Sequence, residues 1–254
     1  MPPAPLRAPV LRVLLAEAEL ELAPHEIAGH PAVRASAKSQ DRRPGQVLLD
    51  QNLHGAALGK LEDGARRGRP DIVHYCLLTL LESPLNKAGG LEVAIHTRHR
   101  LLIRVRPDTR LPRGEARFQG LMGKVLREGR SQDKKPLIWV QDDVLTPAQA
   151  LHAFAKGPVL RLDEGGALLS PADIAARADA GQDLTLVLGA FPSGAFLPEW
   201  VEAVPEAVSI WKEPLNAWAV AAEVTAGYRA RWGAALAPQA PSPTSAPGSP
   251  KAGG

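Results

Sequence analysis

Three arginines in this sequence are spaced so that their guanidinium groups could bind a row of phosphates or the carbonyl edge of a base. Arg110, Arg113 and Arg117 follow one another at spacings of three and four residues, with Pro112 between the first two. If a helix begins near Pro112, Arg113 and Arg117 share one face and Arg110 precedes it. Planar guanidinium groups suit phosphate and carbonyl oxygens. A solvated helix face explains the spacing about equally well.

A fourth arginine has a carboxylate close by in sequence. Arg69 and Asp71 lie two residues apart across Pro70. The carboxylate could pair with the guanidinium and fix its direction, which would prepare Arg69 to bind an anion. Plain capping of a helix that starts at Pro70 is the alternative.

Two loops near the C-terminus have the composition of a ligand site. Gly189 and Gly194 flank a turn directly after an apolar run, and glycine allows backbone amides to approach a ligand closely. A second loop runs from Ile210 through Trp211, Lys212, Glu213 and Pro214 to Leu215. Adjacent loops of this kind could hold an adenosine between them. The glycine turn lacks the dinucleotide fingerprint, and taken alone it is more often structural.

Other reactive residues give weaker signals. His96 and His99 have a workable separation for a metal, but they cross a predicted turn and lack companion ligands, so we expect no metal site. Cys76 falls within an apolar run, where a buried inert thiol is the better interpretation. The sequence contains no Walker loop, nucleophile elbow or metalloprotease helix.

The elements that must position these residues can be predicted from periodicity and from proline and glycine. In the first half, the apolar run Ile72–Leu81 predicts a core helix bounded by Pro70 and Pro84. Alternation predicts a hairpin whose second strand carries basic residues on its outer face, namely Arg100, Arg104 and Arg106. The other expected elements are strands at 10–15 and 46–50, helices at 16–28 and 54–64, and hairpin strands at 91–97 and 101–105.

Regular alternation of strands and helices marks the second half of the chain. The expected elements are strands at 137–140, 159–162, 184–188 and 207–210, with helices at 147–155, 171–180 and 214–232. This order predicts an α/β fold with a mostly parallel sheet and helices on both faces. Ligands of such sheets usually lie outside the carboxyl ends of the strands, which is where both candidate loops fall.

Length and composition set the limits of the molecule. The 254 residues are 45% hydrophobic and 22% charged, which excludes a disulfide miniprotein and a wholly disordered chain. Residues 237–254 contain five prolines, three glycines and a single charge, so we expect a disordered tail after one domain spanning 1–236. We expect no secretory signal and no membrane span, because the sequence contains no long apolar run, and its single cysteine fits a reducing cytoplasm.

The small net charge of +3 hides an uneven distribution. Residues 66–130 contain 14 Lys and Arg against 6 Asp and Glu, whereas the rest of the chain contains 16 against 21. The middle of the chain therefore carries +8 and the remainder −5, which predicts a polarised surface that attracts a polyanion. An ordinary solvated face is the alternative.

Taken together, these motifs resemble a ribosome-biogenesis family of the SPOUT methyltransferase class, which methylates N1 of a pseudouridine in small-subunit ribosomal RNA. The resemblance covers about residues 10–232 in family order, and the combination of motifs is specific although no single motif is. The matching stretches are Arg67-Gly68-Arg69-Pro70-Asp71-Ile72-Val73-His74, Ser83-Pro84-Leu85-Asn86, Ile95-His96-Thr97, Arg110-Leu111-Pro112-Arg113, Arg117-Phe118-Gln119-Gly120-Leu121-Met122, Gly189 to Gly194, Val208-Ser209-Ile210 and Pro214-Leu215-Asn216-Ala217-Trp218.

The resemblance implies a homodimer whose C-terminal part forms a trefoil knot, with S-adenosylmethionine bound in the knot loops. It implies a small-subunit rRNA partner and leaves contacts with other ribosome assembly factors open. The implied catalytic residues are Arg69 and Asp71, and the role of Asp71 is to orient Arg69. The implied RNA-binding residues are Arg69, Arg110, Arg113 and Arg117. The implied cofactor-binding residues are Leu162, Gly189, Gly194, Ile210, Trp211, Lys212, Glu213, Pro214 and Leu215.

The chain departs from the family pattern at Trp211-Lys212-Glu213, which is bulkier and more charged than the usual small polar residues. Backbone contacts in that loop would be unaffected by the change. A noncatalytic rRNA-binding assembly factor with vestigial knot loops is the competing function, and methylation of a different RNA is a third. The intact glycine turn at 189–194 and the helix entry at Pro214 favour retained cofactor binding.

Overall fold

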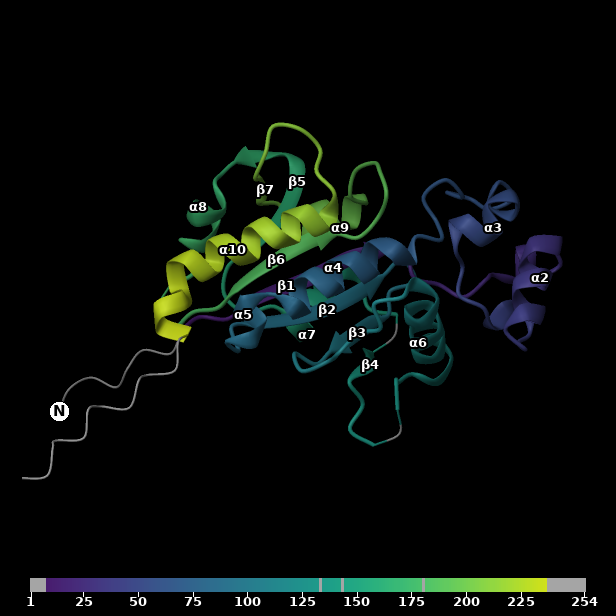
Figure 1. Ribbon diagram of the computed structural model, residues 1–254. Coiled ribbons are helices and arrows are strands. Elements are labelled where there is room, and N and C mark those ends of the chain that lie inside the picture. The colour runs from purple at the N-terminus through teal and green to yellow at the C-terminus, as the bar shows by residue number, and fades with distance from the viewer. Residues whose placement is uncertain (1–7, 133, 143, 180, 237–254) are drawn as a thin grey trace, which may run out of the picture.

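A computed structural model describes residues 8–132, 134–142, 144–179 and 181–236, and its centre is one seven-stranded sheet (Figure 1). The strand order is β4-β3-β2-β1-β6-β5-β7, in which β2, β1, β6, β5 and β7 are parallel and β3 is antiparallel to both of its neighbours. The predicted α/β fold with a mostly parallel sheet is confirmed. The strands are Leu11–Ala18 (β1), Leu91–Thr97 (β2), Leu102–Val105 (β3), Ile138–Asp142 (β4), Val159–Leu168 (β5), Leu184–Gly189 (β6) and Ala207–Ser209 (β7).

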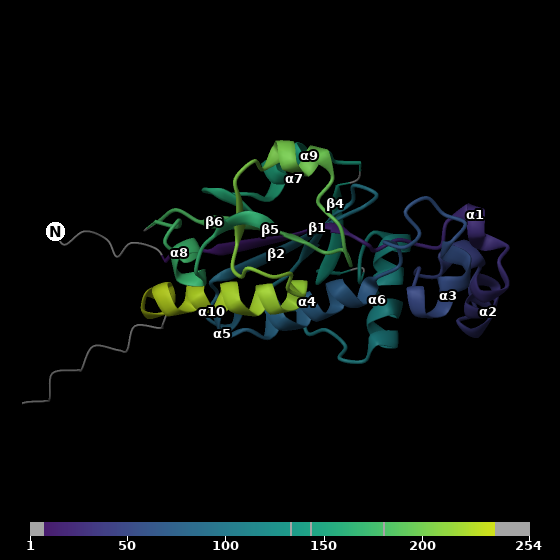
Figure 2. The ribbon, with the colours of Figure 1, turned by 90° about the horizontal axis from the view of Figure 1, so that it is seen from above.

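Helices cover both faces of this sheet, as predicted. Apolar side chains of α4, α6, α8 and α10 pack on one face, and those of α7 and α9 pack on the other (Figure 2). The helices are His25–Ala28 (α1), Pro31–Ser39 (α2), Gln51–Leu58 (α3), Pro70–Glu82 (α4), Pro84–Lys87 (α5), Glu115–Glu128 (α6), Pro147–Phe154 (α7), Pro171–Ala175 (α8), Pro198–Ala203 (α9) and Ala217–Leu236 (α10), with a 3-10 turn at Pro44–Gln46 (η1).

Helix α4 forms as its sequence predicts. Pro70 occupies the first turn, where a missing N–H costs nothing, and Asp71 complements the helix dipole. The helix ends at Glu82, and Ser83 then caps α5 by accepting a hydrogen bond from the Asn86 amide. Because most of its apolar side chains are buried between the sheet and its neighbours, α4 is a rigid base for the residue that precedes it, Arg69.

The prediction of a helix at 16–28 is wrong. The chain continues as strand to Ala18 and stays extended beyond it, and only His25–Ala28 is helical. Glu17, Glu19 and Glu21 are each at most 3% exposed, and arginines from elsewhere in the chain hold all three carboxylates. These ion pairs hold the three side chains in a chain that is not helical, so tertiary contacts override the local helix preference.

Other boundaries also differ from the predictions. The predicted strand at 46–50 is a 3-10 turn followed by a single bridge between Leu22 and Leu48. Helix α6 begins after the cap Gly114, so Arg113 precedes the helix and does not share a helical face with Arg117. Strand β5 is longer than expected, α8 is shorter, and α10 starts at Ala217 instead of at Pro214. The hairpin and α7 are confirmed.

Helices α1, α2 and α3 form a lobe with its own small core, set apart at one end of the sheet (Figure 1). None of the helices that the structure describes is both long and apolar enough to cross a bilayer. The expected tail at 237–254, and the first seven residues of the expected domain, lie outside the described residues.

Candidate functional site

A cavity of about 420 Å³ opens at the carboxyl ends of β6 and β7 and at the point after Leu162 where β5 stops pairing with β6. These parts of the strands form its floor, and the two candidate loops form its walls. Eight of the nine predicted cofactor-binding residues line it, and Lys212 does not. Those eight are Leu162, Gly189, Gly194, Ile210, Trp211, Glu213, Pro214 and Leu215. The size is within the range of small-molecule sites.

Two aromatic side chains pack around a glycine in the first loop and fix its conformation. Phe191 and Phe196 meet edge to face with ring centroids 5.2 Å apart. A Cβ atom on Gly189 would lie 2.7 Å from the Phe191 ring, so only glycine allows this approach. Gly194 has φ +87°, a left-handed conformation that other residues adopt only with strain. Both predicted glycines are therefore required by the shape of the cavity wall.

The second loop is ordered from its base at β7. The Ser209 hydroxyl donates a hydrogen bond of 2.6 Å to the Trp211 carbonyl, which bends the chain into the loop. The Trp211 side chain is 53% exposed although it borders the cavity. Lys212 and Glu213 form a long, exposed ion pair of 3.9 Å. The bulky, charged stretch thus lies at the rim of the cavity.

The prediction omitted several cavity residues, and three of them carry a charge or an aromatic ring. Asp163 and Glu164 follow the buried part of β5, and Phe196 comes from the end of the first loop. An acidic pair directly after an apolar strand, followed by Gly165-Gly166, was the available signal. Asp163 already pairs with Arg161 at 3.2 Å, so Glu164 is the carboxylate that makes the cavity suitable for a ligand with positive charge.

Arg69 and Asp71 form the predicted pair. Arg69 donates two hydrogen bonds to the carboxylate, Nε to Oδ1 at 2.8 Å and Nη2 to Oδ2 at 2.7 Å. These bonds raise the pKa of Arg69 above its usual value, with Asp50 adding a weaker electrostatic contribution. About a quarter of the Arg69 side chain remains exposed. The guanidinium is therefore fixed in direction and still accessible to a partner.

The stretch that carries the other three arginines is anchored on α4. His74 lies on α4, and its Nε2 is 2.8 Å from the Pro112 carbonyl oxygen. The same imidazole stacks on Phe118 of α6 with centroids 4.2 Å apart. Arg110, Arg113 and Arg117 are all exposed, and within the described part of the chain no carboxylate pairs with them. His74 thus brings their segment to the helix that Arg69 begins.

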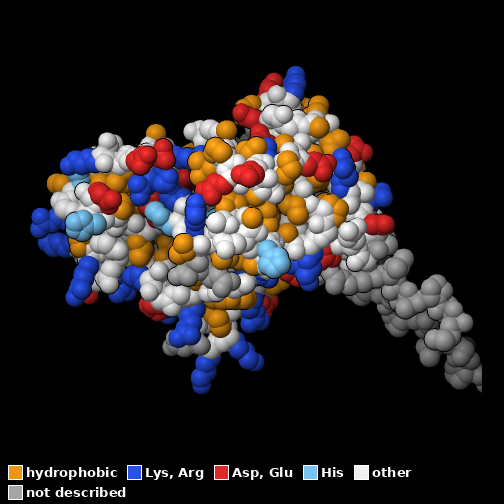
Figure 3. Space-filling model, turned by 180° about the vertical axis from the view of Figure 1, so that it is seen from behind, with side chains coloured by type: hydrophobic (Ala, Val, Ile, Leu, Met, Phe, Trp, Pro, Cys, Tyr) orange, Lys and Arg blue, Asp and Glu red, His pale blue; other side chains and the backbone are white. Residues whose placement is uncertain are grey.

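The basic surface is wider than the stretch 66–130. Figure 3 shows Lys and Arg side chains also gathered over the lobe of α1, α2 and α3, where Arg34, Lys38, Arg42 and Arg43 are exposed. By contrast, several arginines of the basic stretch are not available at the surface. Arg66, Arg67 and Arg98 neutralise buried glutamates, and Arg104 lies over the Phe154 ring. The prediction of a basic outer face on the hairpin is therefore only partly right.

The cavity and the fixed arginine can now be compared with known proteins. The family model described as EMG1/NEP1 methyltransferase matches residues 13–229. The chain belongs to the EMG1/NEP1 methyltransferase family. This membership confirms the resemblance inferred from the sequence.

Individual members of the EMG1/NEP1 family match along almost their whole length. The ribosomal RNA small subunit methyltransferase Nep1 of Thermococcus kodakarensis is 40% identical over 224 residues, which are 88% of this chain and 100% of that protein. The Thermococcus sibiricus protein of the same name is 39% identical over 86% of this chain and 97% of its own. The crystal structure of Archaeoglobus fulgidus Nep1 bound to S-adenosylhomocysteine is 36% identical, with TM-score 0.78, and covers 89% of this chain and 99% of that chain.

Proposed function

We propose that this protein transfers a methyl group from S-adenosylmethionine to N1 of a pseudouridine in small-subunit ribosomal RNA. The observation that carries the proposal is the cavity beside β5 and at the ends of β6 and β7, which two loops of the expected composition enclose. A homologue with the same fold holds S-adenosylhomocysteine, the product that such a transfer leaves behind. The named relatives are small-subunit rRNA methyltransferases.

The residues of the cavity fit this cofactor. Leu162, Leu188 and Val208 offer an apolar floor for an adenine ring, and the loop backbones offer amides and carbonyls for its edge. Glu164 offers negative charge to the sulfonium and ammonium groups, whereas the Asp163 carboxylate already pairs with Arg161. Bound S-adenosylmethionine supplies an electrophilic methyl group.

The arginines act on the RNA base that accepts the methyl group. N1 of pseudouridine carries a proton, because the base is joined to ribose through carbon, and it becomes nucleophilic when that proton leaves. The target base leaves its stack in the RNA before it reacts. Arg69, which Asp71 holds, then stabilises the negative charge that develops on a carbonyl oxygen of the base. Asp71 is a poor proton acceptor because both of its oxygens already accept bonds from Arg69. Its role is to position Arg69.

Arg110, Arg113 and Arg117 bind the RNA backbone in this proposal. Replacing one phosphate-binding arginine lowers the slope of log K against log salt by about 0.9. We expect Arg117→Ala and Arg113→Ala each to weaken hairpin binding and to lower the salt slope, with unchanged S-adenosylhomocysteine affinity. Arg177→Ala is the control, because it removes an exposed arginine that pairs with Glu206. A loss of cofactor affinity in Arg117→Ala would place that arginine wrongly.

Labelled S-adenosylmethionine tests the reaction directly. The protein is incubated with two hairpin RNAs that differ only in carrying pseudouridine or uridine at one loop position, and label is followed on each. We expect label on the pseudouridine hairpin alone. Label on uridine would contradict the stated substrate, and failure to bind the cofactor would contradict the enzyme. RNA binding together with cofactor binding but no transfer would favour the assembly-factor alternative.

The proposal extends to the chain topology and assembly that the resemblance implies. We propose a trefoil knot around β5, β6 and β7, a homodimer, and a cytoplasmic location where small subunits are modified. Exposed Tyr75 of α4 packs against Trp218 of α10, so these two helices share an apolar surface that a second copy could cover. Analytical ultracentrifugation of the full chain should give twice the 27.0 kDa mass. A monomer at micromolar concentration would contradict the dimer.

A further inference from the structure

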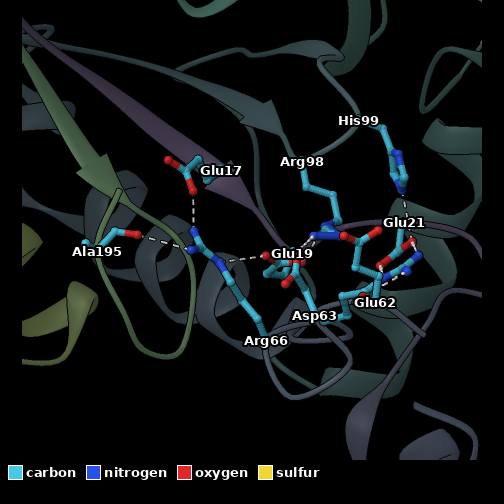
Figure 4. Close-up of polar contacts among 10 residues, drawn as sticks. Glu17, Glu19, Glu21, Glu62, Asp63, Arg66, Arg98, His99 and Ala195 are labelled. Carbon is cyan, nitrogen blue, oxygen red and sulfur yellow. Dashed lines mark hydrogen bonds and ion pairs between the residues drawn. The ribbon is translucent and has the colours of Figure 1, made fainter. Parts of the chain in front are cut away.

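Three buried carboxylates lie in the segment at the end of β1. The arginines that pair with them differ in their other contacts. Glu17, Glu19 and Glu21 lie at alternate positions and are almost fully buried. Buried carboxylates need cationic partners, and each has at least one. Arg66 pairs with Glu17 and Glu19 (Figure 4). Arg67 pairs with Glu21.

Only one of these arginines also reaches the wall of the cavity. Arg66 Nη1 donates a hydrogen bond of 3.2 Å to the Ala195 carbonyl (Figure 4). The Arg66 guanidinium also lies 3.8 Å from the Phe191 ring centroid. Glu17, which Arg66 holds, accepts a hydrogen bond of 2.7 Å from the Leu197 amide. Arg66 and its partner Glu17 therefore contact the first cavity loop, residues 189–197, at three positions.

The backbone of Glu17 is strained where it makes this contact. Its φ is +51°, in the left-handed region, at a register shift in the pairing of β1 with β2. A residue other than glycine keeps such a conformation only where surrounding contacts hold it. The contacts with Arg66 and Leu197 hold the Glu17 backbone in this conformation. Loss of either contact would allow the backbone to relax into another arrangement.

At its other end Arg66 is connected to Arg69 by a short, tethered segment. Arg67 is fixed on Glu21, with 2.8 Å between Nε and Oε1. The Gly68 carbonyl accepts a hydrogen bond of 2.8 Å from the Gln51 amide. Gly68 has φ +70°, and a Cβ there would lie 3.1 Å from the Gln51 nitrogen, so the segment has little room to move. We therefore expect a change in the position of Arg69 to change the position of Arg66.

We propose that Arg66 is a positioning residue that couples the cavity loop 189–197 to Arg69, so that RNA and cofactor bind cooperatively. This inference rests on the proposed function, which places cofactor in the cavity and RNA at Arg69. RNA bound at Arg69 favours the observed arrangement of residues 66–69 over the relaxed one, and in the observed arrangement Arg66 holds Ala195 and Phe191 in place for the cofactor. Coupling between two binding sites is reciprocal, so the cofactor tightens RNA binding by the same factor.

The test measures this factor with calorimetry on the full chain. S-adenosylhomocysteine is titrated with and without a saturating hairpin RNA that carries pseudouridine in its loop. For the unchanged protein we expect affinity to rise at least fivefold with RNA, at the lower end of typical coupling. In Arg66→Ala the ratio should fall to about one, because the loop no longer senses Arg69. Both ligands should still bind separately.

Arg98→Ala is the matched control. The Arg98 side chain is 19% exposed against 18% for Arg66, and it pairs with the same Glu19, but its ion pairs reach Asp63 and not the cavity loop. This variant should keep the coupling. If it loses coupling as Arg66→Ala does, the acidic cluster acts only through general stability and the proposal is wrong.

Remaining outcomes separate this inference from the proposed function. If the unchanged protein binds both ligands independently, only the coupling is overturned. If it binds no S-adenosylhomocysteine, the proposed function itself fails. Should Arg66→Ala not fold, Arg66→Lys decides, because an ammonium keeps charge near Glu17 and Glu19 but cannot also hold Ala195 and stack on Phe191. Coupling that persists unchanged in Arg66→Lys would overturn the proposal.

Discussion

At the scale of single residues, one short motif has different roles at its two positions in the fold. The sequence contains Arg-Pro-Asp twice, at 69–71 and at 106–108, and both copies form bidentate pairs. Arg106 and Asp108 are exposed at the surface, whereas Arg69 begins the buried helix α4. The pairing follows from local geometry, but only the first copy lies where Arg69 can serve the site.

Asp71→Asn tests the positioning role with a natural control. The amide removes the charge that holds Arg69, and hydrogen bonds to charged groups contribute about 1.5–3 kcal/mol. We expect kcat/KM for methyl transfer to fall roughly ten- to a hundredfold, with unchanged S-adenosylhomocysteine affinity, in a radiometric assay and a titration. Asp108→Asn should leave both quantities unchanged. Equal effects of the two substitutions would remove the special role of Asp71.

Glu19 gives a pH-dependent prediction. Burial is the main cause that raises its pKa from 4.5 to about 7, against the attraction of Arg98 and Arg66. Below pH 4.5 the carboxyl is protonated in both states. Between pH 4.5 and 7 only the unfolded chain ionises, so stability falls as pH rises, and above 7 the loss is complete at roughly 3 kcal/mol.

Glu19→Gln should remove this dependence. Urea unfolding at several pH values should show the variant gaining stability relative to the unchanged protein between pH 4.5 and 7. Glu82→Gln, which removes an exposed carboxylate, is the control. A constant difference between Glu19→Gln and the unchanged protein across this range would show that Glu19 ionises alike in both states.

At the scale of elements, the cavity depends on loop conformation more than on side-chain chemistry. Gly194 and Gly129 both have positive φ, +87° and +74°, and a Cβ at either would meet open space. Gly194 is in the cavity loop, whereas Gly129 ends α6. A side chain at either position would therefore introduce similar backbone strain, in the cavity loop in one case and at the end of α6 in the other.

Alanine at each position should cost about 1–2 kcal/mol of stability, because L-residues strain in this conformation. Only Gly194→Ala should weaken S-adenosylhomocysteine binding, by about tenfold, since the loop can relieve strain by leaving the cavity wall. Thermal unfolding and calorimetric titration measure the two effects. If Gly129→Ala weakens binding as much, the loss reflects global stability and not the loop.

Elements with a strong local signal were predictable. Helix α4 has a proline start and an apolar run, and the hairpin of β2 and β3 alternates regularly. The stretch after β1 was not predictable, because its glutamates favour helix locally and are held extended by arginines some 50 to 80 residues away. The same limit applies to α6, where three arginines in helical spacing are divided by the cap at Gly114.

At the scale of the whole molecule, Cys76 reports on the integrity of the core. It lies on α4 within the main core, is fully buried, and burial raises the pKa of its thiol. Reaction with a thiol reagent at pH 8 should therefore follow opening of the core. S-adenosylhomocysteine should slow the reaction, because a ligand that binds only the folded state stabilises it. Rapid labelling of the native protein would contradict this burial.

Residue types and spacing alone determined the family, the α/β class, eight of the cavity residues and the pairing of Arg69 with Asp71. These features follow from local conformation and from motifs that are contiguous in sequence. Tertiary structure decided which charges are available. Buried glutamates of the acidic remainder neutralise Arg66, Arg67 and Arg98, so part of the +8 in the middle of the chain never reaches the surface. Long-range ion pairs in a buried environment depend on chain topology, which composition and periodicity do not contain.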